Sequence, residues 1–389
     1  MSALSRLRSH TAARHLPAVV AVMAIAIFPI FRPPLDGLMG DCIQALAFVV
    51  MALGLNIVVG FAGLLDLGYV AFYAFGALSM GWLASDHFTG IGGETGIHIG
   101  VTEFAGRLPG IHLNFLLVVI AAILVTAIAG ALIGLPTLRL RGDYIAIVTL
   151  AFGEIIGRVA ANGDEVVISG YKLSNGRQSI APIDQINLPL IGEFDQATDL
   201  RSYFWAGLAL VLVVLFVNFR LRDSRMGRAW IALREDEVAA ASMGVPLVRT
   251  KLMAYAVGAA FGGISGAFLG AFLQSVNANQ FQFGFSIFIL AMVILGGLGS
   301  IWGVVIGAVL LSFVNTRFLS QLDQGIGNDV LGALGLDFTF SEIKFGVFGF
   351  ILVIVMVLRP EGLLPERRRK LELTEGIGAG EESIYEARA

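Results

Sequence analysis

Long apolar segments separated by short charged ones run along most of the chain. A helix needs about 20 consecutive apolar residues to cross the hydrocarbon core of a bilayer, and charged residues usually mark the ends of such runs. The pattern therefore predicts an all-α membrane protein with about ten transmembrane helices. The expected spans are residues 16–31, 42–60, 67–84, 115–135, 144–161, 203–219, 252–273, 281–298, 300–317 and 343–358.

The composition agrees with this arrangement. Hydrophobic residues make up 57% of the 389 residues and charged residues only 14%, whereas soluble domains carry about 25% charged residues. Glycine occurs 48 times, and glycine allows membrane helices to approach each other closely. Gly258, Gly262, Gly266 and Gly270 recur every four residues, so they share one helix face. We expect packed helices rather than a β-barrel, with these four glycines in a helix contact.

The distribution of basic residues predicts the orientation. Lysine and arginine are concentrated in the segments on the same side as the amino-terminal tail, and such segments stay in the cytoplasm. No small-residue cleavage site follows the first run, so it is expected to remain as a helix. With an even number of spans, both termini are then cytoplasmic. The predicted organisation is a tail at 1–15, a transmembrane permease domain at 16–361 with a cytoplasmic loop at 220–251, and a tail at 362–389.

Two glycine-rich breaks interrupt apolar runs, at 60–69 and 296–299. Backbone that leaves a helix at membrane depth must line a cavity or be buried in protein, and transporters place broken helices beside their substrate path. The breaks are candidates for the wall of a translocation path, with ordinary turns between spans as the alternative. The candidate residues are Gly60, Gly63, Asp66, Gly68, Tyr69, Gly296, Gly297 and Gly299.

The loop at 220–251 combines helix-forming residues, clustered charges and a glycine stop. These features predict a short amphipathic helix on the inner surface that docks into a groove on a soluble partner. A solvated loop is the alternative. The candidate docking residues are Gly227, Arg228, Arg234, Glu235, Asp236, Glu237, Ala239, Ala240 and Gly244.

Several other chemistries have little support in the sequence. Cys42 is the single cysteine, the histidines lack zinc-type spacing, and the net charge of −3 gives no reason to expect nucleic acid. No lysine follows a glycine, so a phosphate-binding P-loop is absent and nucleotide energy must come from another chain. An ion-coupled secondary transporter remains possible, although Asp66, Glu154 and Arg158 are its only charged candidates. Glu154 and Arg158 also have the spacing of a structural ion pair.

Four segments together resemble the permease subunits of branched-chain amino-acid ABC importers, of the LivM type. The first is GLNIVVGFAGLLDLGY at 54–69, and the others lie at 140–156, 227–240 and 292–303. The resemblance extends over roughly residues 40–362. Val238, Ala239, Ala240 and Gly244 match the spacing of the ATPase-coupling motif of ABC permeases, which reads Glu-Ala-Ala, three residues, Gly. Valine replaces the glutamate here, and the neighbouring acids at 235–237 are the candidates to substitute for it.

The resemblance implies an ABC importer permease fold in the cell inner membrane. It implies a transport subunit without cofactor or enzymatic activity of its own, with ATP and Mg bound by two cytoplasmic ATP-binding subunits. A second permease subunit and an external solute-binding protein complete the expected assembly. The implied solute is a branched-chain or other hydrophobic amino acid, and urea or a small amide is the alternative.

Overall fold

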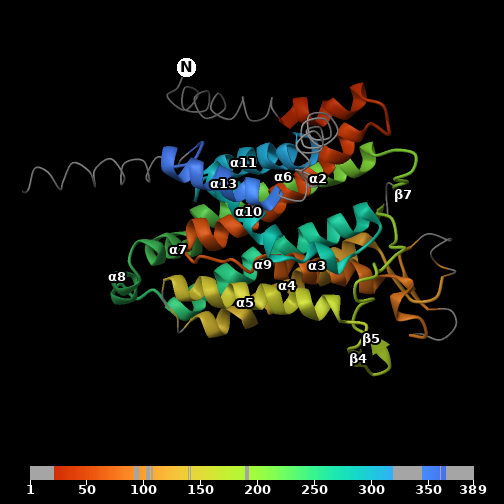
Figure 1. The fold of residues 1–389 in the computed structure, drawn as a ribbon, viewed down its shortest axis with the longest axis horizontal. Coiled ribbons are helices and arrows are strands. Elements are labelled where there is room, and N and C mark those ends of the chain that lie inside the picture. Colours follow the sequence, from red (N-terminus) through yellow and green to blue (C-terminus); the bar gives the residue numbers. More distant parts are fainter. Residues whose placement is uncertain are drawn as a thin grey trace, which may run out of the picture.

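The computed structural model describes residues 22–91, 96–101, 106, 108–138, 140, 142–188, 192–318, 344–359 and 361–364. The described chain is mostly helical (Figure 1). The main helices are α2 (Gly37–Leu55), α3 (Val70–Leu83), α4 (Phe115–Thr137), α5 (Asp143–Ala161), α6 (Arg201–Asp223), α7 (Arg225–Glu235), α8 (Glu237–Ser242), α9 (Leu247–Leu273), α10 (Phe283–Gly296), α11 (Ile301–Phe313) and α13 (Lys344–Leu358). The π-helical segments η2 (Asn56–Phe61) and η6 (Val314–Phe318) extend α2 and α11.

Six of these helices are long and apolar enough to cross a membrane. They are Gly37–Phe61, Phe115–Thr137, Tyr144–Ala161, Arg201–Asp223, Leu247–Leu273 and Ile301–Phe318. Shorter apolar helices occur at Val22–Phe31, Val70–Leu83 and Phe283–Gly296. The chain is therefore a multi-pass helical membrane protein. Each predicted run overlaps a helix, while crossings beyond these six stay predictions. The predicted tail at 1–15 and residues 365–389 of the predicted tail at 362–389 lie outside the described residues.

Helix α9 lies at the centre of the packing, against α2, α3 and α4 (Figure 1). Its four evenly spaced glycines form the predicted contact. A Cβ at Gly262 would lie 3.0 Å from Cβ of Phe72, and one at Gly266 would collide with the carbonyl oxygen of Tyr73. Gly258 approaches α2 closely, because a Cβ placed there would lie 3.0 Å from the carbonyl oxygen of Gly54. The sequence prediction of a glycine contact is confirmed.

The all-α prediction missed three small sheets in the connections between helices. One sheet has the order β1-β3-β2, where β1 (Ala84–Ser85) pairs antiparallel with β3 (Ile111–Leu113) and β2 (Ile97–Ile99) pairs parallel with it. The others are the antiparallel pairs β4 (Val167–Ile168) with β5 (Tyr171–Lys172) and β6 (Asn187–Leu188) with β7 (Gly192–Glu193). Strands of two or three residues are too short to show an alternating pattern in the sequence.

The two ends of the helical body differ in structure. Figure 1 shows α7 and α8 at one end and the labelled strands β4, β5 and β7 at the other. We call these the α8 end and the strand end. The sequence predicts that the α8 end faces the cytoplasm, because the basic loop at 220–251 forms it.

The predicted pair of Glu154 and Arg158 is present on α5. Nε of Arg158 lies 3.8 Å from Oε2 of Glu154, and both side chains are exposed to a large extent. This spacing is that of a local ion pair one helical turn apart.

Candidate functional site

The two glycine breaks, far apart in the sequence, lie against each other. The backbone N–H of Gly299 donates a hydrogen bond of 2.9 Å to Oδ1 of Asn56, which belongs to the π-helical turn η2. A Cβ at Gly60 would lie 2.7 Å from the nitrogen of Gly299. Position 60 therefore needs glycine because of this close contact, and Gly299 has a φ of +84°, which also favours glycine. π-Helical turns inside helices occur frequently at functional sites.

The first break also contacts α7. Nη1 of Arg234 donates a hydrogen bond of 2.7 Å to the carbonyl oxygen of Gly60. Gly63 has a φ of +70°, and a Cβ there would lie 2.7 Å from Cγ of Arg234. The predicted path segment and the predicted docking loop are thus one contact region, which the sequence alone did not indicate.

Residues 66–69 are fixed by bonds to other helices. The backbone N–H of Leu67 donates to Oγ1 of Thr149 at 3.0 Å, and the hydroxyl of Tyr69 donates to the carbonyl oxygen of Gly258 at 2.6 Å. Gly68 packs so closely on α5 that a Cβ would collide with the carbonyl oxygen of Thr149. Asp66 is buried and accepts from the N–H of Gly68 at 2.9 Å. This part of the break is held firmly in place.

The second break is covered by residues 361–364. Leu363 donates its N–H to the carbonyl oxygen of Leu295 at 2.8 Å, and Leu364 donates to that of Gly296 at 3.1 Å. Gly297 has a φ of +115°, and a Cβ there would lie 3.1 Å from the carbonyl oxygens of Glu361 and Leu364. Protein therefore surrounds this break closely, which meets the requirement for irregular backbone at membrane depth.

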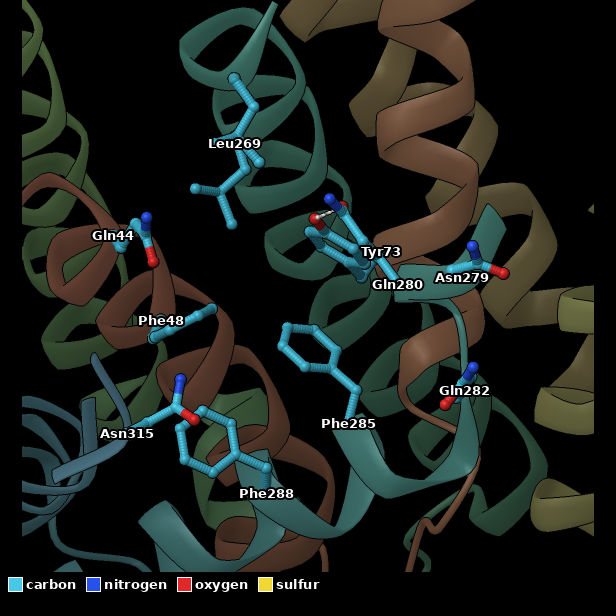
Figure 2. A pocket seen from close by; sticks show the side chains of 11 residues that line it. Gln44, Phe48, Tyr73, Leu269, Asn279, Gln280, Gln282, Phe285, Phe288 and Asn315 are labelled. Atoms are coloured by element: carbon cyan, nitrogen blue, oxygen red, sulfur yellow. Dashed lines mark hydrogen bonds between the residues drawn. The ribbon is translucent and has the colours of Figure 1, made fainter. Parts of the chain in front are cut away.

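A cavity of about 350 Å³ opens between α2, α3, α9, α10, η6 and the 3-10 helix η5 (Ala278–Gln280), near the last turn of α9 and the first turns of α10. Figure 2 shows side chains from these elements arranged around one space. Its size lies at the lower end of the range for small-molecule pockets, about 300–1,000 Å³. The lining residues are Gln44, Phe48, Tyr73, Leu269, Leu273, Asn279, Gln280, Gln282, Phe285, Phe288 and Asn315.

The lining combines aromatic and aliphatic side chains with uncharged amides. The ring of Phe48 packs edge-on against Phe285 and Phe288, with centroids 5.7 and 5.6 Å apart. The hydroxyl of Tyr73 donates a hydrogen bond of 2.9 Å to Oε1 of Gln280, which is drawn in Figure 2. Such a surface suits a small solute with an apolar part and a few polar groups.

The predicted path residues do not line this cavity. They pack against one another and against α5, α7 and α9, so their role in a translocation path stays a prediction. The cavity residues were not among the residues predicted from the sequence, although the sequence contains a signal for some of them. Gln44 and Asn315 are amides inside apolar runs, and polar residues within membrane segments are functional candidates by default.

The loop at 220–251 folds into two short helices rather than the single one expected. Ser224 caps α7 by accepting from the N–H of Gly227 at 3.2 Å. Asp236 separates α7 from α8 and caps α8. Its Oδ1 accepts hydrogen bonds from the N–H groups of Val238 and Ala239 at 2.7 and 3.0 Å. Gly244, with a φ of +83°, follows the end of α8. Aspartate at an N-cap is a usual start signal for a helix, and glycine after the C-terminus is a usual stop signal.

Several predicted docking residues form contacts within the chain. Glu237 forms an ion pair of 2.7 Å with Lys251, and Arg228 donates to the carbonyl oxygen of Asp223 at 3.0 Å. Gly227 packs tightly against the end of α6, and Ala240 is buried. Trp230, which sequence analysis did not select, is fully buried and donates to the carbonyl oxygen of Thr250 at 2.9 Å. These contacts fix the two helices to α6 and α9.

The outward surface of α8 is small and partly apolar. Val238 and Met243 are 66% and 85% exposed, and Glu235, Ala239 and Gly244 are also exposed. Figure 1 shows α8 at the extreme edge of the α8 end. Val238 in α8 and Met243 directly after it are therefore candidates for contact with a partner, because exposed apolar side chains on protruding elements are used in docking.

Comparison with known proteins places this helical membrane protein in a class of transport subunits. The profile of the family described as branched-chain amino acid transport system / permease component matches residues 40–356. The high-affinity branched-chain amino acid transport system permease proteins LivM of Salmonella typhimurium strain LT2 and Escherichia coli strain K12 are each 35% identical to the chain. In both cases the match covers 94% of this chain and 78% of the relative. LivH of Escherichia coli strain K12 is 27% identical over 54% of this chain and 64% of its own length.

The chain therefore belongs to the family of permease components of branched-chain amino acid transport systems. It is a transport subunit. No solved structure matches the chain.

Proposed function

We propose that this chain is one of two permease subunits of an ABC importer that carries branched-chain or other hydrophobic amino acids across the cell inner membrane. The observation that carries the proposal is the cavity between α2, α3, α9 and α10, whose rings and amides suit an amino acid with an apolar side chain. Membership of the permease family supports the same reading. The similarity of the chain to both LivM and LivH supports a second, related permease subunit beside it.

In the proposed assembly, two cytoplasmic ATP-binding subunits bind ATP and Mg and dock on α8. The exposed Val238 and Met243 support this arrangement, because they offer an apolar surface at the α8 end. An external solute-binding protein delivers the solute at the strand end. The chain then crosses the membrane about ten times with both termini in the cytoplasm, and the glycine breaks at 60–69 and 296–299 lie beside the path on its inner side.

Cysteine labelling tests the orientation. In a Cys42→Ser background, Gln178→Cys at the strand end should react with an impermeant maleimide in intact cells. Met243→Cys on α8 should react only after the membrane is opened. Both positions are exposed, so access by the reagent depends on the side of the membrane. Labelling of Met243→Cys in intact cells, at the rate seen for Gln178→Cys, contradicts the proposed orientation.

Transport by the reconstituted complex tests the function itself. Uptake of L-leucine into proteoliposomes should require the solute-binding protein and ATP hydrolysis, and it should persist when proton and sodium gradients are collapsed. Uptake by this chain alone under an ion gradient, without nucleotide, would establish a secondary transporter instead. ATP-driven uptake of urea in place of L-leucine would support the assignment as an ABC importer but show that its substrate is urea.

A further inference from the structure

A charged pair lies beside the uncharged cavity. Nε of Arg317, in η6, is 3.3 Å from Oδ2 of Asp41, in the first turns of α2. The two elements that carry the pair also line the cavity, through Gln44 and Phe48 on α2 and Asn315 on η6. Figure 2 places these three side chains on the same side of the cavity. The ion pair thus joins the two elements that form this wall.

The position of Asp41 along α2 places it at one end of the cavity wall. Residues three and seven positions apart share a helix face, so Asp41, Gln44 and Phe48 follow one another along the same face. With a rise of about 1.5 Å per residue, Asp41 lies about 4.5 Å along the axis from Gln44 and about 10 Å from Phe48. Asp41 and Arg317 do not line the cavity themselves. They lie beyond its edge, so that a charge, an amide and an aromatic ring follow one another along this face of α2.

The exposure of the pair allows it to exchange partners. The side chains of Arg317 and Asp41 are 44% and 20% exposed, and ion pairs with access to solvent contribute only about 0–1 kcal/mol to stability. A zwitterion offers both groups a new partner. The guanidinium of arginine binds a carboxylate through two parallel hydrogen bonds, and an ammonium group donates to a carboxylate oxygen.

We propose that Asp41 and Arg317 bind the α-ammonium and α-carboxylate groups of an amino acid at the entrance to this cavity. The apolar side chain of the amino acid then lies along Gln44 toward the rings of Phe48, Phe285 and Phe288. This inference rests on the proposed function, because it names the part of the path that recognises the amino-acid backbone. The pair is a specificity element distinct from the external solute-binding protein.

A purely structural pair is the competing explanation, because the same contact joins α2 to η6. The two explanations differ for an exchange of charges. Asp41→Arg combined with Arg317→Asp retains an ion pair between α2 and η6, so a structural role is restored. It also exchanges the positions of the positive and negative groups that bind the amino acid. Because the cavity fixes the direction of the amino-acid side chain, the carboxylate and ammonium groups then meet like charges, and binding is not restored.

The test uses the purified complex of permease and ATP-binding subunits in lipid nanodiscs, without the solute-binding protein. Cys42→Ser with Asn279→Cys places a single reporter thiol of this chain in the cavity lining, and the partner subunits are made cysteine-free. The measured quantity is the rate of maleimide reaction at position 279 as L-leucine is added. L-Leucinamide lacks the carboxylate and 4-methylpentanoate lacks the ammonium group, so these two molecules test each charge separately.

L-Leucine is expected to slow the reaction, and leucinamide and 4-methylpentanoate are not. Asp41→Asn and Arg317→Gln should each raise the half-protecting concentration of L-leucine by about tenfold or more, equivalent to about 1.4 kcal/mol. Asp36→Asn, at the N-cap of the same helix, is the matched control and should leave it unchanged. The inference is overturned if L-leucine gives no protection or if leucinamide protects. It is also overturned if the variants are protected as well as the parent, or if the charge exchange fully restores protection by L-leucine.

ATP-driven uptake with the solute-binding protein is measured on the same preparation. If the complex transports L-leucine but the labelling rate at position 279 does not respond as described, the binding role of Asp41 and Arg317 is wrong and the proposed function stands. If the complex transports no amino acid, the proposed function fails independently of the labelling result.

Discussion

Gly266→Leu is expected to remove most of the folded protein from the membrane. A Cβ at this position collides with the carbonyl oxygen of Tyr73 and lies 2.7 Å from the nitrogen of Ala77, so α3 and α9 must separate to accept any side chain. Overpacking a well-packed contact costs about 1–3 kcal/mol. The cost should be at least of that size here, because the obstacle is backbone and α9 also packs against α2 and α4.

The measurement is the yield of monodisperse protein after detergent extraction, normalised to total expression. Gly40→Leu is the matched control, because it is a glycine in α2 with no atom within 4 Å of its Cβ position. The control should give close to the parent yield. Similar yields for Gly266→Leu and Gly40→Leu would show that the contact between α3 and α9 does not depend on glycine.

The second large effect is expected on α8. Val238→Asp combined with Met243→Asp should lower ATP-driven uptake by about tenfold or more, with loss of the ATP-binding subunits from the purified complex. Both side chains are exposed, so the chain itself should remain folded. Apolar anchors at interfaces each contribute about 2 kcal/mol or more, and an unpaired carboxylate in such a surface adds a desolvation cost.

Ile168→Asp is the control for this variant. Ile168 is another exposed apolar residue, 61% accessible, but it lies in β4 at the strand end. Its replacement should leave the ATP-binding subunits attached. If the subunits also stay attached to the α8 variant and uptake is unchanged, α8 is not their docking site.

The sequence predicted the helices and the glycine contact because both depend on local periodicity. Apolar runs correspond to helices over most of the described chain, and glycines four residues apart must share a face wherever the helix packs. The small sheets were missed because their strands have two or three residues each. The interruption of the cytoplasmic loop at Asp236 was also missed, although aspartate followed by good helix formers is a usual N-cap signal.

The candidate site was harder to predict because its residues come from distant segments. Gln44, Tyr73, Gln280 and Asn315 acquire a common role only when α2, α3, α9, α10 and η6 surround one cavity. Tyr73 and Gln280 are unremarkable in their own segments, whereas Gln44 and Asn315 stand out only as amides within apolar runs. The sequence predicts special backbone at the glycine breaks, but no pattern in it indicates that Asn56 joins one break to the other. A side chain that bonds a distant backbone group leaves no periodic pattern.

The bond between Arg234 and residue 60 has a consequence for how this chain evolves. Its acceptor is a main-chain oxygen, which every amino acid supplies at that position. The contact with Gly299 restricts position 60 to glycine, but this restriction is independent of the bond, whereas a change at position 234 removes the donor. The bond therefore depends on the type of residue only at position 234. Correlated variation between the two segments carries no trace of it, and related sequences can reveal it only through constancy of the arginine.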